Sequence, residues 1–140
     1  MTTSTKVDFE YKAPSHTAES LSPALVVLPA ALIGTWHNVN SSTRDLVKIA
    51  ISAAGSGISV NPYGACVPTP CNWGASSGIV YAPNVSSNHA EAFSADFTFS
   101  FAKAHVVGHL VGKELLVEVF TIFTDGSGRS NLYTSDTMVR

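Results

Sequence analysis

The sequence predicts an all-β fold, a single eight-stranded antiparallel up-and-down β-barrel preceded by an N-terminal arm. Short runs rich in Val, Ile, Phe and Thr follow Gly34 and are separated by clusters of Gly, Ser, Asn and Pro, which is the pattern of an all-β meander. One run alternates between apolar and polar residues, as a strand with one buried face does. About eight such runs occur, and eight strands just close a barrel around side chains or one small ligand.

The chain has 140 residues, which suits one domain with its own core. Residues 1–22 are polar and predict a flexible N-terminal arm, and residues 23–140 form the predicted barrel domain. The domain opens with the apolar segment 23–33, interrupted by Pro23 and Pro29. We expect this segment to be a short helix or an extended stretch that closes one end of the barrel.

The strands are expected where apolar periodicity lies between turn signals, with boundaries uncertain by about two to four residues. Their expected positions are residues 34–40, 46–53, 57–63, 73–82, 91–101, 104–111, 114–124 and 131–139.

The inward face is clearest in residues 91–101, where apolar side chains occupy every second position. A two-residue turn at Gly112–Lys113 then sets the register of the next hairpin. The residue pairs expected from this turn are Val111 with Glu114, Leu110 with Leu115, Gly108 with Val117, and Val106 with Val119. A tight connection around Ala102–Lys103 would place Phe99 opposite Val106 and Phe97 opposite Gly108.

Composition excludes several classes of function. Charged residues make up 13% of the chain against roughly 25% in typical soluble domains, which predicts a neutral surface and self-association. The net charge is −2 and the eight Lys and Arg residues are scattered, so nucleic acid is not an expected partner. The apolar run at residues 24–33 is about half of the ~20 residues that a membrane span needs. Residues 1–12 lack the apolar core of a secretory signal, so we expect a cytoplasmic protein without membrane partners.

Two segments carry a resemblance to known proteins. The first predicted strand begins Gly34-Thr35-Trp36-His37-Asn38, and it resembles the Gly-x-Trp strand of calycins, the superfamily of lipocalins, fatty-acid-binding proteins and avidins. Residues 124–131 are similar to the last hairpin of avidins. The resemblance implies that Trp36 closes one barrel end and that Asn38 is an interior polar group. Residues 66–74 together with 123–131 also resemble a microbial family of small barrel proteins of unknown activity.

The leading functional hypothesis is binding of an apolar or amphipathic small molecule in an aromatic-lined cavity. Its expected binding residues are Trp36, Asn38, Tyr63, Trp73, Phe97, Phe99, Phe101, Phe123 and Tyr133. The alternatives are a cofactor-free cyclase or isomerase acting on a polyene or polyketide-like substrate, and a homo-oligomeric interaction protein. Candidate catalytic residues are Asp136, Tyr133 and Asn38, and alternation puts Asp136 and Tyr133 on opposite faces of one strand. Sequence motifs predict no metal and no cofactor.

A polar cluster is expected around His105 and His109, with Asp96 and Glu118 on neighbouring strands. The register places it on the outer wall, where a solvated or subunit-interface role is expected. With an inverted barrel the same residues would form an active site.

Two further motifs leave alternatives open. Cys66 and Cys71 can form a loop disulfide, remain free thiols or supply half of a metal site. Arg129 either binds an anionic ligand group at the barrel mouth or pairs with Asp125 in a solvated turn.

Overall fold

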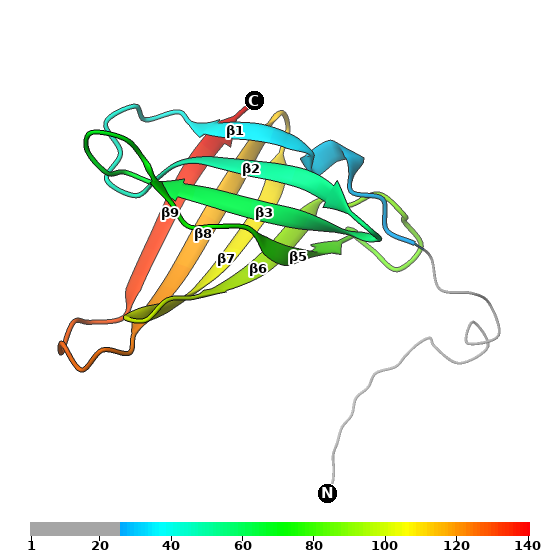
Figure 1. Cartoon of the computed structure of the whole chain (residues 1–140). Helices are drawn as coiled ribbons and strands as arrows, with labels where there is room; N and C mark the ends of the chain where they lie inside the picture. Colours follow the sequence, from blue (N-terminus) through cyan, green and yellow to red (C-terminus); the bar gives the residue numbers. More distant parts are fainter. Residues whose placement is uncertain (1–25) are drawn as a thin grey trace, which may run out of the picture.

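A computed structural model describes residues 26–140, and the predicted arm at residues 1–22 lies outside this part of the chain. The strands wrap into a closed antiparallel barrel (Figure 1). They are β1 (Gly34–Asn38), β2 (Leu46–Ala54), β3 (Gly57–Gly64), β4 (Cys71–Asn72), β5 (Ser76–Tyr81), β6 (Ala92–Thr98), β7 (Ala102–Val111), β8 (Glu114–Phe123) and β9 (Leu132–Val139). Eight of them form the ring, which confirms the predicted fold class, and the two-residue β4 pairs with β3 outside it.

Each strand of the ring pairs with its neighbours along the chain, apart from the extra strand β4. The barrel closes where β1 meets β9, through the pairs His37 with Val139 and Asn38 with Met138. Because β1 ends at Asn38, the following loop continues along β9, where the Val39 amide donates to the Thr137 carbonyl at 3.0 Å. This loop therefore borders the barrel interior at the open end.

The two predicted hairpin registers have different outcomes. All four expected pairs between β7 and β8 are present, and Gly112 adopts the positive φ of 61° that the turn needs. The predicted register between β6 and β7 was wrong, because Phe97 lies opposite Ala104, and the residue opposite Gly108 is Phe93. The turn falls at residues 100–101, and because the shift is by an even number of residues, Phe93, Ala95 and Phe97 still face inward.

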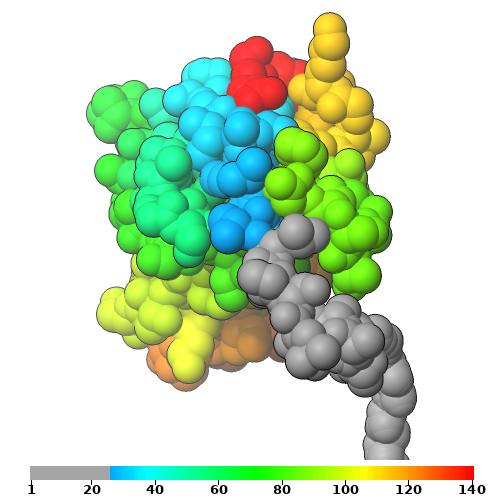
Figure 2. Space-filling model, turned by 90° about the vertical axis from the view of Figure 1, so that its right-hand side faces the viewer, coloured from blue at the N-terminus to red at the C-terminus, as the bar shows by residue number. Residues whose placement is uncertain are grey.

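One end of the barrel is closed by the segment that precedes β1. Ala30–Leu32 forms a 3₁₀ helix whose Leu32 is fully buried, and the Trp36 indole Nε1 donates to the Leu32 carbonyl at 3.0 Å. Figure 2 looks at this end and shows the blue segment lying between the β2–β3 turn and the β5–β6 loop. The expectation that residues 23–33 close one end is confirmed for those that the structure describes.

The last residue of the chain completes this closed end. The Arg140 guanidinium lies 4.4 Å from the centroid of the Trp36 ring, and its Nη1 donates to the Ile33 carbonyl at 2.8 Å. A cation over an indole face is attracted by the ring quadrupole. Arg140 thus joins β9 to the segment before β1.

Side chains fill the barrel from the closed end to its middle. The fully buried large residues are Trp36, Phe93, Leu32, Leu46, Ile49, Ile58, Leu115, Met138, Val60, Val106, Val117 and Pro62. This packed core fills the closed end and the middle of the barrel interior. Within residues 26–140, no helix has the length and apolar character of a membrane span.

Candidate ligand-binding site at the open end of the barrel

A pocket of about 340 Å³ lies at the open end, between the β1–β2 loop, the segment that joins β3 to β5, the β6–β7 turn and the start of β9. We call it the mouth pocket. It is lined by Arg44, Asp45, Leu46, Gly64, Ala65, Cys66, Cys71, Trp73, Phe101, Val119, Thr121, Leu132 and Thr134. Pockets of roughly 300–1,000 Å³ with apolar walls and a few polar groups are typical small-molecule sites.

Aromatic rings form one wall of this end. The Trp73 ring packs edge to face on Phe97 at 5.7 Å and on Phe99 at 5.3 Å between centroids. Phe99 stacks in turn on Phe101 at 5.6 Å. Of these four rings, Trp73 and Phe101 line the mouth pocket, while Phe97 and Phe99 support them from behind. Contacts of this kind fix the orientation of Trp73.

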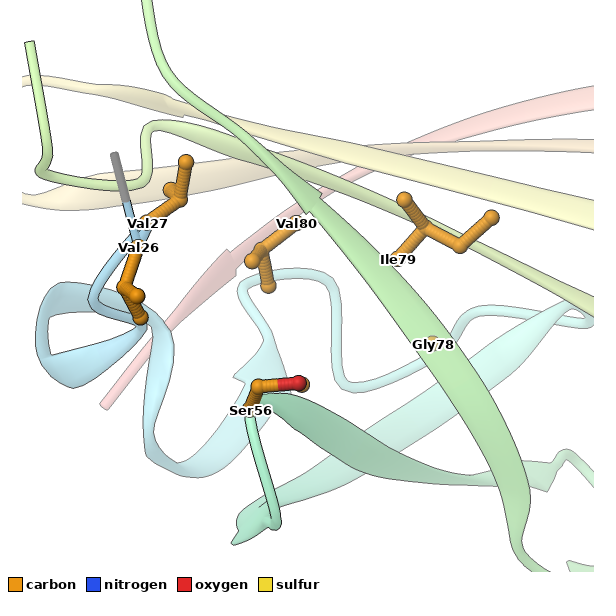
Figure 3. A pocket seen from close by; sticks show the side chains of 7 residues that line it. Val26, Val27, Ser56, Gly78, Ile79 and Val80 are labelled. Carbon is orange, nitrogen blue, oxygen red and sulfur yellow. The ribbon is translucent and has the colours of Figure 1, made fainter. Parts of the chain in front are cut away.

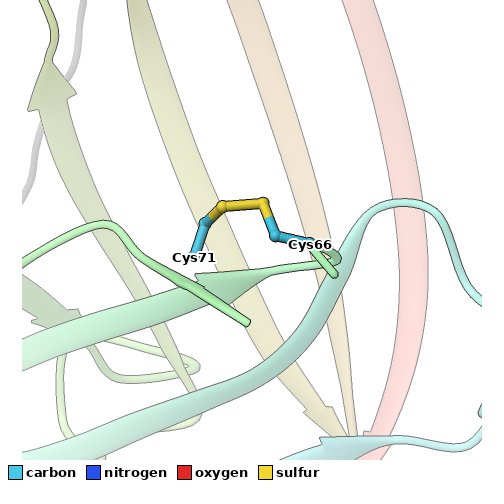
Figure 4. Close-up of a disulfide and its surroundings, with 2 residues drawn as sticks. All are labelled: Cys66 and Cys71. Atoms are coloured by element: carbon cyan, nitrogen blue, oxygen red, sulfur yellow. A yellow bond between two sulfur atoms is a disulfide. The ribbon is translucent and has the colours of Figure 1, made fainter. Parts of the chain in front are cut away.

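The backbone on which Trp73 sits is held in two ways. Its amide donates to the Pro62 carbonyl at 3.0 Å, and Gly64 lets the indole lie close, since a Cβ at Gly64 would stand 3.1 Å from Trp73 Nε1. A disulfide between Cys66 and Cys71 closes the loop after β3, with their Cα atoms 5.4 Å apart (Figure 4). Of the three states considered for these cysteines, the structure shows the disulfide.

One carboxyl group lines the pocket, and a second lies one layer below it. Asp136 pairs with the buried Val117, so it is the residue of β9 that points inward, and its Oδ2 is buried with no hydrogen-bond partner. Asp45 lines the pocket itself. Burial raises the pKa of Asp45 above its ordinary value of 3.8, and the negative charge of Asp136 raises it further.

Asn38 holds the loop between β1 and β2. Its side-chain amide donates to the Leu46 carbonyl at 2.8 Å, and its Oδ1 accepts from the Asn40 amide at 2.8 Å. Asn38 is half-buried but does not line the mouth pocket. Its amide therefore shapes the loop that carries Asp45.

Three other expected interior residues are placed elsewhere. Tyr63 lies on the outer wall beneath Lys48, whose Nζ is 4.4 Å from the ring centroid. Tyr133 also faces outward and donates its hydroxyl proton to Glu118 at 2.6 Å. The expectation that these two tyrosines line the interior was wrong, because alternation turns their neighbours Pro62 and Thr134 inward. Trp36 points inward but belongs to the packed closed end and not to the pocket.

The polar cluster lies on the outer wall, as the β7–β8 register predicts. His105 Nδ1 and Asp96 Oδ1 are 2.6 Å apart, and both side chains are solvent-exposed. Glu118 is engaged by Tyr133 on the same wall. Among residues 26–140, no three His, Cys, Asp or Glu side chains are grouped as metal ligands would be. The inverted-barrel alternative is wrong, because His105 and Asp96 face solvent and not the barrel interior.

The β8–β9 hairpin carries a small structured turn at the rim. Arg129 forms an ion pair with Asp125 at 2.8 Å, and its guanidinium lies 4.0 Å from the centroid of the Phe123 ring. Of the two alternatives for Arg129, the structure shows the pairing with Asp125 in the turn. Hydrogen bonds from Ser127, with a smaller contribution from Arg129, lower the pKa of Asp125 from 3.8 to about 2. Phe123 is covered by Arg129 and does not line the mouth pocket.

Two larger hollows lack this combination of groups. One of about 440 Å³ lies between the segment before β1 and strand β5 (Figure 3). The side chains that line it in the described part of the chain come from Val26, Val27, Ser56, Ile79 and Val80, without an aromatic or charged group. A hollow of about 560 Å³ outside the β1–β2 loop also has no aromatic lining among those residues.

Sequence reasoning missed much of the pocket. Val119, Thr121 and Thr134 lie on the inward face, which the alternation along β8 and β9 indicates. Arg44 and Asp45 precede β2 in a loop, and no local pattern marks them as pocket residues. Of the expected binding residues, Trp73 and Phe101 line the pocket.

Comparison with known proteins gives no relative from which a role could be transferred. No family model, curated protein or solved structure matches the chain. The function is therefore inferred from the geometry of the mouth pocket.

Proposed function

We propose that this protein binds an apolar or amphipathic small molecule in the mouth pocket. The observation that carries the proposal is a pocket of about 340 Å³ walled by Trp73 and Phe101, at the one end of the barrel that core side chains leave open. Apolar walls with few polar groups favour binding by shape and by burial of apolar surface.

The rigidity of the walls supports the proposal. Trp73 is fixed by edge-to-face contacts with Phe97 and Phe99, and the Cys66–Cys71 disulfide closes the loop that precedes it. A wall that is already ordered loses little conformational entropy when a ligand binds.

A direct test uses 4-phenylbutan-1-ol as the probe in isothermal titration calorimetry. W73A and F101A are each expected to weaken its affinity by about three- to tenfold, which corresponds to an aromatic contact of about 0.5–1.5 kcal/mol. F120A is the matched control, because Phe120 is an aromatic residue of the outer wall that is 45% exposed. Equal losses in all three variants, or no binding by the unmodified protein, would contradict the proposal.

A second measurement looks for the natural ligand. Mass spectrometry of metabolites released by denaturing freshly purified protein is expected to show a compound enriched over the W73A variant. The same compound at equal abundance in both samples would argue against the mouth pocket as its site.

The cofactor-free cyclase or isomerase is the second candidate. Asp136 favours it, as an inward-facing carboxyl group with a buried, unpartnered Oδ2. The other catalytic candidates fit less well, because Tyr133 faces outward and the Asn38 side chain is engaged in the loop. If a released compound is converted by the protein, D136N should slow the conversion, and unchanged turnover would remove Asp136 from the mechanism.

Homo-oligomerisation and cytoplasmic location remain predictions. The outer wall exposes Phe120 and Tyr133, whose rings lie 5.2 Å apart, and this patch supports self-association. Light scattering at high concentration tests self-association, with F120K as the disrupting variant.

The cellular location can be tested through the disulfide. Disulfides persist mainly in oxidising compartments, so trapping the thiols of Cys66 and Cys71 in cells tests the location.

A further inference from the structure

Two carboxyl groups, neither with an ion-pair partner in the described part of the chain, lie in or just below the mouth pocket. Asp45 lines the pocket and is half-buried, and Asp136 lies on the same inward face of β9 as the lining residue Thr134, two positions nearer the closed end. Asp136 therefore sits one layer below the pocket. Neither carboxylate has an ion-pair partner among the described residues.

The Asp136 carboxylate also lacks a full set of hydrogen bonds. Its Oδ2 is buried and accepts none. Buried polar atoms are nearly always hydrogen-bonded, and an unsatisfied one costs about 1–3 kcal/mol. Its partner on β8, Val117, and the next inward-facing residue of β9, Met138, are apolar and fully buried, so they offer no donor.

The one cation of the pocket does not cancel this charge. Arg44 lines the rim and is exposed, so water and salt screen its guanidinium. The two carboxylates are deeper and are screened less. Burial is the larger cause of the raised pKa of Asp45 and the charge of Asp136 is the smaller one, so the two carboxyl groups interact electrostatically.

We propose that the ligand of the mouth pocket is an amphipathic amine. Its apolar body lies against Trp73 and Phe101, and its protonated amino group binds Asp45 within the field of Asp136. This inference rests on the proposed function and specifies the chemical class of the ligand. Amphipathic acids are disfavoured, because their carboxylate would meet two like charges.

Three probes of the same length and different charge test the proposal. They are 4-phenylbutylamine, 4-phenylbutan-1-ol and 4-phenylbutanoate, titrated at about pH 7.5, where carboxyl groups are ionised. The amine should bind about tenfold more tightly than the alcohol, which is the scale of one charge-assisted hydrogen bond, and the acid should bind most weakly.

Charge-neutral variants locate the effect. D45N and D136N should each reduce the preference for the amine over the alcohol by about threefold or more. E118Q is the matched control, since it removes the same charge from the outer wall, where Glu118 accepts from Tyr133. Near-ultraviolet circular dichroism checks that each variant is folded.

The outcomes separate the two proposals. An alcohol that binds as tightly as the amine, or an amine preference that E118Q reduces as much as D45N and D136N do, overturns the amine inference and leaves the binding function standing. If none of the three probes binds to the folded protein, both proposals fail. Should D45N fail to fold, the preference measured in the unmodified protein and in D136N still decides the question.

Discussion

The ring of Phe93 occupies the space that a side chain at Gly108 would need. The two residues are partners in the β6–β7 ladder, and a Cβ on Gly108 would stand 2.3 Å from Phe93 Cε2. Phe93 is fully buried, so the glycine allows a large ring to fill the middle of the barrel. This contact lies within the packed core of the barrel.

G108A is therefore expected to lower the free energy of unfolding by about 1–3 kcal/mol, because the added methyl group overpacks the core. The measurement is urea denaturation followed by tryptophan fluorescence. Adding F93L to G108A should recover part of the loss, although F93L alone destabilises by leaving a void. Strict additivity of the two changes would show that the close contact does not determine the stability.

Arg140 is expected to stabilise the closed end through Trp36 and Ile33. R140M should lower the free energy of unfolding by about 1–2 kcal/mol, since it removes a cation–π contact and a hydrogen bond. K113M is the control, because it removes one positive charge from the exposed β7–β8 turn. If the two substitutions lowered the free energy of unfolding equally, the loss would be explained by the change in net charge and not by the contacts of Arg140.

The disulfide should matter for both stability and binding. Replacing both cysteines, as C66S with C71S, is expected to cost about 2 kcal/mol of stability for a loop this short. The affinity for 4-phenylbutan-1-ol should fall by about threefold, because the freed loop must be ordered again on binding. Calorimetry on this variant and on the protein treated with a dithiol reductant should agree. Unchanged affinity in both would show that the wall of the pocket is rigid without the bond.

The interaction of Asp45 with Asp136 predicts a pH dependence. A raised pKa means that the folded state holds the Asp45 proton more tightly than the unfolded state does. Ionising Asp45 therefore costs folding stability, and this cost develops as the pH rises from about the ordinary value of 3.8 through the raised folded-state pKa. In D136N the pKa of Asp45 should fall part of the way back, because burial, the larger cause, remains.

Carboxyl ¹³C chemical shifts measured against pH test this prediction. Asp125 is an internal control, since its lowered pKa of about 2 arises from Ser127 and Arg129 at a different turn. An unchanged Asp45 titration in D136N would show that burial alone accounts for the shift.

The strand pattern could be predicted from the sequence because it is local. Alternation with a period of two residues decides which side chains of a strand share a face, and turn residues decide where the strand ends. This is why the eight strands of the ring, the inward face of Val106, Gly108 and Leu110, and the outer position of His105 agree with the sequence-based expectations.

The same alternation could not fix the β6–β7 register. A shift by an even number of residues preserves both faces, so Phe97 has an apolar partner in Ala104 as well as in Gly108. The space needed by Phe93 favours the observed register, and such steric fit depends on atoms from two strands at once. The choice between Asp136 and Tyr133 likewise followed from strand pairing, which places Asp136 beside Val117.

The sequence by itself determined an all-β barrel with an apolar segment that closes one end, because these features depend on neighbours along the chain. The place of Trp36 at that end was implied by the resemblance to calycins. Only the tertiary structure decided where a ligand can fit. Trp73 and Asp45 come from separate loops, and Asp136 comes from β9. They lie at the same end of the barrel because the ring of strands closes between β1 and β9. Contacts between residues far apart in the sequence determine this arrangement, and local periodicity does not encode such contacts.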